Sequence, residues 1–564
     1  MRSSMMFGLV LIFGWVLPAQ ESAVVDGLAQ DAATLRKWLG DYKTGAIRLA
    51  SKGQVMEAAL NRARKVMFDV VRHEKLTAAQ LLFKVATVKP TLPGGSATSS
   101  DQVAFFGELR VFQIRTMARK FIAGMENTAV EDWLLGLAQK KQGSANYKDV
   151  ASQAGAALRI LAARASPRAK EALLRGCRSF KPEVRVQAIN AISSAASLPL
   201  VPHFMELIRD KEPYVRIACV NGLGRGLREH TDETIHDTIE PDVAKLRDQA
   251  IKVLGGILIR DKIWQVRAAA RENLAVMKTK HAIPALIDGL KAELGRTKDP
   301  WSLDIRLHKA LEGLTGIKMP LGQVRTWQTF WKREAATFKF APKGAKAGDE
   351  GAKDSKYDKF FNLELDSNRV LFIVDFSGSM VETITLKTKG VGTGAVGNSR
   401  TTTKSRLVVE ELKKIVMTLK DGDLFNIIVF GDDVRPWRAG KNGRPALVKM
   451  NDGHRDDLLG GYLDNLQPSG LTNLYGALEA ALSIGGRGLH DKYYGLGYDT
   501  LYVLSDGAPT TGKITDTEEI LRVVQETNSL KRLSINTITF GDLNQLIFLK
   551  KLAAQNNGRH IHID

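Results

Sequence analysis

One short helical signature occurs four times between residues 181 and 314, and it constrains the fold more than any other feature. A Val-Arg pair begins at Val184, Val215 and Val266, and Ile305-Arg306 takes the fourth place. The copies are 31, 51 and 39 residues apart, and the longer interval predicts an insertion near residues 228–240. Further apolar helices are predicted between the copies. Because a pair of helices cannot bury its apolar face alone, these repeats predict a solenoid of stacked helix pairs.

The signatures resemble HEAT-like repeats, of the short variety with Val-Arg and several alanines on the first helix. We assign residues 151–335 to the array, with a closing cap that contains Trp327 and Trp331, and residues 20–150 to a preceding helical region. The resemblance implies an extended surface for another protein. The arginines have two interpretations. They form a basic surface for an acidic protein or an anionic polymer, or they mostly pair with aspartates of neighbouring repeats and the stack is a spacer.

Positive charge is unevenly distributed along the 564 residues. The chain holds 81 Lys and Arg against 61 Asp and Glu, a formal net charge of +20. Residues 361–564 contain 24 basic and 24 acidic side chains, so the surplus lies in residues 1–360. This difference predicts two modules with different partners. The only two cysteines, Cys177 and Cys219, exclude a disulfide scaffold and a cysteine-rich metal module, and both are expected to be buried core residues.

Two segments outside these regions have signatures of their own. Residues 1–19 contain one arginine, an apolar run from Met5 to Leu17 and a small residue at the end. This order predicts a signal peptide, because the run is shorter than the roughly 20 residues that span a bilayer. An uncleaved N-terminal membrane anchor is the alternative. Residues 336–360 are predicted to be a linker, because 341–358 lack any bulky aliphatic residue.

Residues 361–564 show a different pattern, in which short apolar runs alternate with helical segments. Near-continuous apolar strands are typical of a parallel sheet that is covered on both faces. Their alternation with helices predicts a doubly wound, Rossmann-like α/β domain. Ligands of such domains bind at the carboxyl ends of the strands. The predicted strands are the runs Arg369–Asp375, Leu424–Asp432, Thr500–Asp506 and Leu533–Asp542.

Oxygen-bearing side chains follow two of these runs. Asp375, Ser377 and Ser379 alternate after the first run, and a tight turn there brings their oxygens together. Asp506 ends the third run, and a glycine-containing loop with Thr472 lies between the two positions in the sequence. Hard oxygen donors with few carboxylates suit Mg²⁺ or Mn²⁺, which keep several waters. The sequence therefore predicts a divalent metal site formed by these residues.

The same five residues, in this order, resemble the metal-ion-dependent adhesion site of a von Willebrand factor A-type domain. That family's pattern is Asp-x-Ser-x-Ser after the first strand, a Thr in a distant loop and an Asp after a later strand. All five positions are matched. The resemblance implies that Ser377, Ser379 and, in some states, Thr472 bind the metal directly. It also implies that Asp375 and Asp506 act mainly through water.

Two further features of this domain bear on the predicted site. The Thr- and Gly-rich segment 381–404 is an insertion relative to the family pattern, and its position puts it beside the metal. It either sets partner specificity or is disordered. His560 and His562 alternate on the predicted last strand and face the same side. Because no third ligand is near them in the sequence, we interpret them as ordinary side chains.

These features predict an exported, non-enzymatic binding or adhesion protein. A partner's Asp or Glu carboxylate would complete the coordination of the bound metal, and the helical array would be a scaffold or a second binding surface. Export argues against nucleic acid as a partner, and no membrane span is expected after signal cleavage. A metal-dependent hydrolase is one alternative, although the sequence shows no general base beside the metal. A structural envelope scaffold with a stabilising metal is another.

Overall fold

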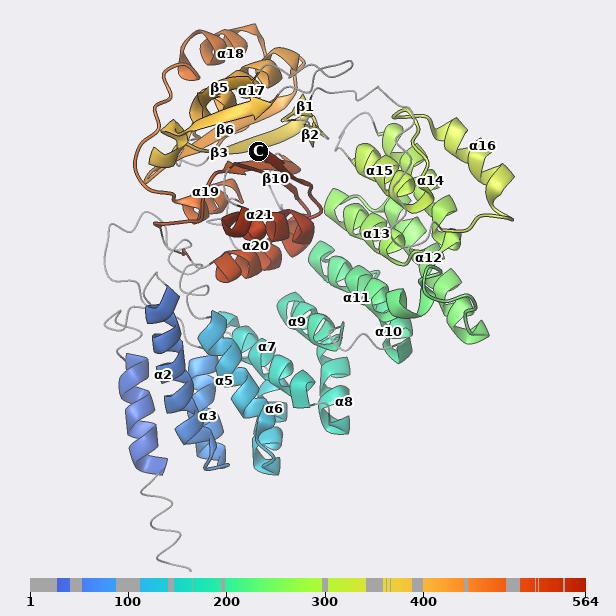
Figure 1. Ribbon diagram of the computed structural model, residues 1–564. Helices are drawn as coiled ribbons and strands as arrows, with labels where there is room; N and C mark the ends of the chain where they lie inside the picture. The colour runs from blue at the N-terminus through green and yellow to red at the C-terminus, as the bar shows by residue number, and fades with distance from the viewer. Residues whose placement is uncertain are drawn as a thin grey trace, which may run out of the picture. The chain divides into compact units, whose positions relative to one another are not determined.

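Helices make up most of the described chain up to residue 340, and a sheet flanked by helices follows (Figure 1). The computed structural model separates two compact units, Met1–Ile192 and Ser193–Asp564. The boundary between the two units, after Ile192, lies inside the predicted array 151–335. Residues 1–19, 341–358 and 388–398 lie outside the described part, so the predicted signal peptide and most of the predicted linker stay predictions. The described residues are 28–40, 53–87, 112–139, 147–164, 166–193, 198–296, 303–340, 359–361, 363–365, 367–387, 399–440, 445–482, 498–512, 514–515, 517–540 and 543–563.

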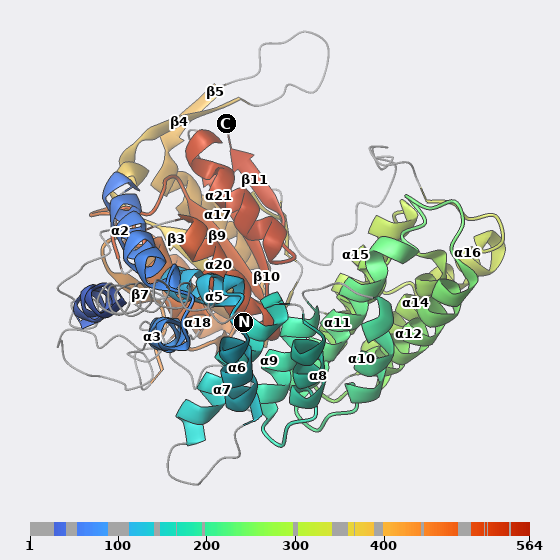
Figure 2. The same ribbon diagram turned by 90° about the horizontal axis from the view of Figure 1, so that it is seen from below.

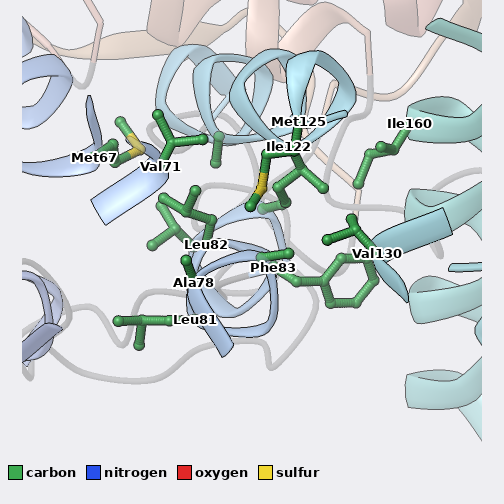
Figure 3. Close-up of a cluster of buried hydrophobic side chains, with 14 of the residues drawn as sticks. Met67, Val71, Ala78, Leu81, Leu82, Phe83, Ile122, Met125, Val130 and Ile160 are labelled. Carbon is green, nitrogen blue, oxygen red and sulfur yellow. The ribbon is translucent and has the colours of Figure 1, made fainter. Parts of the chain in front are cut away.

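The first unit is a stack of helices around a continuous apolar core. Figure 3 shows the centre of this core, where side chains from α2, α3, α5, α6 and α7 meet. Leu82 and Met67 are fully buried there, and the ring of Phe83 meets that of Trp133 edge to face at 5.1 Å. The helices are α2 (Gly53–Val71), α3 (Leu76–Ala86), α5 (Phe112–Gly124), α6 (Thr128–Gln139), α7 (Tyr147–Arg164), α8 (Pro167–Gly176) and α9 (Pro182–Ser193).

The second unit begins with helix pairs, which the two views of the ribbon show stacked in sequence (Figures 1 and 2). Contacts run along two rows: α11, α13 and α15 form one row, and α10, α12, α14 and α16 the other. This two-layer stack agrees with the predicted solenoid. The helices are α10 (Val201–Leu207), α11 (Pro213–Thr231), α12 (Pro241–Arg260), α13 (Trp264–Val276), α14 (Ile283–Leu294), α15 (Leu303–Thr315) and α16 (Val324–Glu334).

The arginine of the first three repeat signatures has a structural role that explains the repeat. In α13, Arg267 donates to the backbone oxygens of Asp261 and Lys262, at 2.9 and 3.3 Å. These two carbonyls belong to the turn just before the helix. They therefore have no hydrogen-bond donor within the helix. Arg216 makes the equivalent pair of bonds in α11, and so does Arg185 in α9. The Val-Arg pair thus combines a buried apolar residue with a guanidinium that donates hydrogen bonds to the carbonyl oxygens of the preceding turn.

The same arginines also pair with acidic side chains. Arg216 meets the Asp261 carboxylate with two bonds of 2.7 and 2.9 Å, which link it to the turn before the next signature. Arg267 meets Glu293 at 2.6 and 3.2 Å, and both side chains are 2% exposed. At Arg216 the predicted pairing with an aspartate of the neighbouring repeat is confirmed, whereas Arg267 pairs with a glutamate on the second helix of its own repeat. These two charges therefore do not form a basic surface.

The predicted cap is a helix held by one buried indole. Trp327 of α16 is fully buried, and its Nε1–H donates to Nδ1 of His308 at 3.2 Å. The other ring nitrogen of His308 lies 2.7 Å from the carbonyl of Met319 and acts as the donor in the neutral tautomer. Phe338 packs edge to face on Trp331, so ordered structure continues beyond the predicted boundary at residue 335.

The sheet has the strand order β11-β10-β9-β3-β6-β7, and β8 also pairs with β6. Its central pairs are parallel, as predicted, whereas β7 and β8 are antiparallel to β6. The sheet is therefore mixed. Its strands are β3 (Arg369–Asp375), β6 (Leu424–Phe430), β7 (Val434–Pro436), β8 (Val448–Lys449), β9 (Thr500–Ser505), β10 (Ser534–Phe540) and β11 (His560–Ile563).

Helices cover both faces of this sheet, which explains the near-continuous apolar strands. Every residue of β9 and β10 is buried. On one face Phe372 stacks on Tyr502 at 5.1 Å, within a cluster that includes the apolar side of α17. Figure 1 shows α19, α20 and α21 on the other side. The helices are α17 (Lys404–Thr418), α18 (Asp452–Asp457), α19 (Leu474–Ala481), α20 (Thr517–Lys531) and α21 (Leu543–Gln555).

The predicted insertion 381–404 contains a two-stranded hairpin. Strand β4 (Thr383–Lys387) pairs antiparallel with β5 (Ser399–Thr403), and α17 starts at the next residue. Ile384 and Leu386 pack against the core cluster of the α/β domain. A second small pair, β1 (Lys359–Phe360) with β2 (Leu363–Glu364), precedes β3, so paired structure begins inside the predicted linker.

The predicted burial of both cysteines is confirmed, since Cys177 and Cys219 are buried free thiols. Across the described residues, we find no helix with the length and apolar character needed to cross a membrane.

Candidate metal centre

The predicted site lies at the carboxyl edge of the sheet, where two adjacent parallel strands end. Asp375 is the last residue of β3 and Ser505 is the last residue of β9, and Val374 pairs with Leu504 just before them. Asp506, the residue directly after β9, lies beside the loop that follows β3. Sheet register thus brings together residues that are 131 positions apart in the sequence.

Asp375 is fully buried, and both of its oxygens accept hydrogen bonds. The Ser505 hydroxyl donates to Oδ2 at 2.6 Å, and the backbone N–H of Ser377 donates to Oδ1 at 2.9 Å. Burial raises the pKa of Asp375 to about 6, although these hydrogen bonds act in the opposite direction. The nearby charge of Asp506 raises the pKa further. A cation at this edge would stabilise the ionised form.

The two serines of the motif and Asp506 form a short chain of polar contacts. The hydroxyl oxygens of Ser377 and Ser379 are 3.2 Å apart, and the Ser379 hydroxyl donates to Oδ1 of Asp506 at 2.8 Å. Ser377 and Asp506 are almost completely buried. Four of the five predicted site residues, Asp375, Ser377, Ser379 and Asp506, therefore lie in one connected cluster.

The loop that contains Thr472 packs against the same end of the sheet. Its Gly470 carbonyl accepts the N–H of Gly378 at 2.9 Å, which joins it to the Asp-x-Ser-x-Ser turn. Gly470 has φ +76°, and a Cβ there would lie 2.0 Å from Oδ2 of Asp432, so only glycine fits this approach. Thr472 is buried, and its N–H donates to the Thr510 hydroxyl at 2.9 Å. The fifth predicted residue thus lies on a loop that contacts the cluster.

A lysine reaches the cluster from the far end of the insertion. Nζ of Lys404 lies 2.9 Å from Oδ2 of Asp506 and 2.6 Å from Oε2 of Glu382, and its side chain is 9% exposed. Burial lowers the pKa of Lys404, but the hydrogen bonds to both carboxylates outweigh it and the pKa is raised. Glu382 also accepts the N–H of Lys404 through its carbonyl at 2.9 Å, so the two residues close the base of the β4–β5 hairpin.

The donors of this edge fit a small divalent cation. Two carboxylates and three hydroxyl-bearing residues are hard oxygen ligands, and the hydrogen bonds that the buried Asp375 carboxylate accepts from Ser377 and Ser505 come from neutral donors. The described residues contain no group of three or more His, Cys, Asp or Glu side chains that could hold a metal. This finding does not bear on the edge, because most of its donors are serine and threonine hydroxyls.

Sequence reasoning did not assign roles to several residues at this edge. Ser505 and Thr510 carry no distinctive sequence signal, because hydroxyl residues after strands are common. Lys404 stands at the end of the insertion, and its usable signal is its position at a helix start, where a cation is unfavourable. Asp432 ends the second apolar run and accepts the N–H of Leu471 at 3.0 Å. The position of Asp432 at a strand end was the available signal.

The two terminal histidines make ordinary contacts. His560 Nδ1 lies 2.9 Å from the Thr537 hydroxyl, and His562 Nδ1 lies 3.0 Å from that of Thr539. Both pairs join β11 to β10. These contacts agree with the interpretation of the histidines as structural side chains.

Comparisons with known proteins support the two-part organisation. The HEAT repeat family matches residues 200–225, which contain α10 and the first part of α11, so the predicted repeat is confirmed there. Curated relatives are inter-alpha-trypsin inhibitor heavy chains. Heavy chain H1 of Sus scrofa is 29% identical over 199 residues, which are 35% of this chain and 19% of the relative. Heavy chain H2 of Homo sapiens is 29% identical over 222 residues, 38% of this chain and 20% of the relative.

A third relative extends the same pattern. Heavy chain H6 of Homo sapiens is 28% identical over 225 residues, which cover 38% of this chain and 15% of the relative. The chain spans about a fifth of the length of the curated relatives it matches. The matched lengths are close to that of the α/β domain.

Proposed function

We propose that the chain is a non-enzymatic binding protein that docks an acidic residue of a partner protein through a divalent metal. The observation that carries this proposal is the convergence of Asp375, Ser379 and Asp506 at one edge of the sheet. Together with Ser377 and Thr472 they match the adhesion-site pattern of A-type domains. Mg²⁺ or Mn²⁺ held by these residues would supply an electrophilic position for a carboxylate.

The bonding of the two carboxylates supports binding rather than catalysis. Asp375 accepts from Ser505 and Ser377, and Asp506 accepts from Ser379 and Lys404. A hydrolase needs a general base within reach of a nucleophilic water. Both carboxylates are buried, and they accept hydrogen bonds from other groups of the same site. This arrangement makes neither of them a ready acceptor for a proton of water, which favours the binding function over the hydrolase alternative.

The surroundings of the site support an extracellular adhesion role. The similarity to inter-alpha-trypsin inhibitor heavy chains and the predicted signal peptide at residues 1–19 both favour export. The helical array is proposed to be a scaffold or a second binding surface, and its positive charge favours an acidic protein or an anionic polymer there. Such charge-driven binding should weaken steeply as salt rises past about 0.15 M, where the Debye length is about 8 Å.

The test is capture of partners from native extract by the full chain, with Mg²⁺ and with EDTA. Partners that bind through the metal are lost with EDTA, and a partner set that is indifferent to chelation contradicts the proposal. Thr472→Ala sharpens the test, because it removes one neutral hydroxyl from the loop and leaves both carboxylates in place. This variant should keep the melting temperature and the Mg²⁺ response of the wild type and lose partner capture. Normal capture by Thr472→Ala together with none by Asp375→Ala indicates a structural metal instead.

A further inference from the structure

The arginine of the fourth repeat makes contacts unlike those of the preceding repeats. Arg216 and Arg267 each donate to the turn before their own helix. Arg306, in the equivalent position of α15, donates instead to the carbonyl of Arg532 at 2.7 Å and to the carbonyl of Asp499. Both acceptors belong to the α/β domain. The Arg306 side chain is only 8% exposed.

Side chains on the neighbouring helices reach the same part of the α/β domain. Arg532 pairs with Glu272 of α13, and its other terminal nitrogen donates to Oδ1 of Asn221 in α11 at 2.6 Å. Asn557 also donates to Glu272, at 2.9 Å. Glu272 is 11% exposed and Arg532 is 10% exposed. Each first helix of the row α11, α13 and α15 therefore contributes one polar anchor, and we call this set of contacts the seam.

The backbone on the α/β side of the seam is fixed independently. The Asp499 carboxylate is 1% exposed and accepts from Ser367 at 2.6 Å and from Thr500 at 2.9 Å. Arg532 has φ +58°, a left-handed conformation that costs a non-glycine residue free energy. The left-handed conformation thus occurs at a residue whose side chain makes two contacts with the helical array.

The seam lies at the amino ends of the parallel strands. Asp499 directly precedes β9, and Arg532 lies between α20 and β10. Asp506, at the candidate metal centre, follows the other end of β9. The six residues of β9 span roughly 20 Å at about 3.3 Å per residue. The seam and the candidate metal centre therefore lie at opposite ends of the same parallel strands.

We propose that the first helices of the repeats are a docking surface for the chain's own α/β domain, with Arg306 as the central anchor. The occupant is the amino edge of the sheet, formed by Asp499, Arg532 and their neighbours. Docking at this edge fixes the α/β domain to the array and leaves the carboxyl edge, with its metal site, directed away from the seam. The inference does not depend on the metal or on the proposed docking of an acidic partner.

The test uses the full chain with a specific protease site inserted near residue 350, so that the array and the α/β domain lose their covalent connection after cleavage. The two wild-type fragments should stay together on size-exclusion chromatography. Arg306→Met removes the donor to the Arg532 carbonyl and one of the two donors to the Asp499 carbonyl, which keeps the N–H of Ser534, and it should raise the dissociation constant of the fragments at least about 30-fold. Arg532→Gly should do the same and also relieve the left-handed strain, so it keeps the test valid if Arg306→Met fails to fold.

Arg267→Met is the matched control, because its guanidinium occupies the same repeat position but contacts only the helical array. It should lower the stability of the array and leave the fragments associated. Separation of the wild-type fragments on cleavage, or co-elution of both Arg306→Met and Arg532→Gly with wild-type affinity, overturns the inference. Mg²⁺ binding measured on the same samples reports separately on the metal site, so failure of one proposal is distinguished from failure of the other.

Discussion

Replacement of Asp375 by asparagine tests the electrostatics of the candidate metal centre most directly. The carboxylate is buried, and its pKa rises from 3.8 to about 6 because burial disfavours the charge. This change in the pKa of Asp375 corresponds to a free-energy difference of about 3 kcal/mol between its two protonation states. Asparagine keeps the shape and removes the charge. Metal-free Asp375→Asn should therefore be more stable than the metal-free wild type at pH 7, by up to about 3 kcal/mol.

The pH dependence follows from the direction of this pKa shift. The folded state holds the Asp375 proton more tightly than the unfolded state does, so its ionisation costs nothing below the unfolded pKa. The cost grows as pH rises from about 4 to about 6 and is complete above that. The advantage of Asp375→Asn should accordingly fall to about 1 kcal/mol at pH 4.5. At pH 7 it corresponds to a melting temperature that is about 6–12 °C higher for a domain of this size.

Urea unfolding at pH 4.5 and pH 7, with and without Mg²⁺, measures these differences. Mg²⁺ at 100 times its dissociation constant should stabilise the wild type by about 2.7 kcal/mol and leave the variant unchanged. Asp452→Asn is the control, because this aspartate is 90% exposed and should change stability little at either pH. Equal stability of the metal-free proteins at pH 7, or a difference that persists unchanged at pH 4.5, would falsify the assignment of a buried, charge-strained Asp375.

Three further predictions concern other parts of the chain. Lys404→Met removes a positive charge that pairs with Asp506, so Mg²⁺ should bind about tenfold more tightly in calorimetry; weaker binding would mean that Lys404 mainly holds the carboxylate in position. Trp327→Ala should destabilise the repeat array by about 3–5 kcal/mol in urea unfolding, because it empties the fully buried cap and leaves His308 without a donor; a loss under 1 kcal/mol contradicts this role. Burial raises the pKa of the Cys177 thiol to about 12, so maleimide should label it only after unfolding, and rapid labelling of the folded chain would show that the site opens.

Much of the α/β domain could be predicted from sequence because burial on both faces leaves a strong signal. The runs Arg369–Asp375 and Thr500–Asp506 match β3 and β9 to within one residue. Short, half-exposed strands leave no such signal. β7 spans only Val434–Pro436, and the threonine-rich strands of the insertion alternate too weakly to separate a hairpin from a disordered loop. Antiparallel edges were therefore missed, and the sheet is mixed.

The residues of the candidate site could be predicted from the sequence where they belong to one local motif or lie at the end of a predicted strand. Asp375, Ser377 and Ser379 are adjacent in sequence, and the parallel register explains why Asp506 joins them. Contacts that depend on a side chain crossing from another element were beyond that reasoning. Lys404 is the clearest case, because its ammonium reaches Asp506 over 102 positions of sequence.

The two proposals together give the ends of one strand different tasks. Asp499 and Asp506 flank β9, whose six residues are all buried and pair in parallel with β3 on one side and β10 on the other. A partner that docks as proposed would pull on the carboxyl ends of β3 and β9, and the seam would resist at the amino end of β9. Tension between Asp506 and Asp499 would run along the covalent backbone of β9, whereas tension that enters at Asp375 would reach the seam through the hydrogen bonds between β3 and β9 and load them in shear. Under the two proposals, tension would therefore pass along the best-buried strands, and Arg306→Met should remove the anchor without changing the candidate metal site.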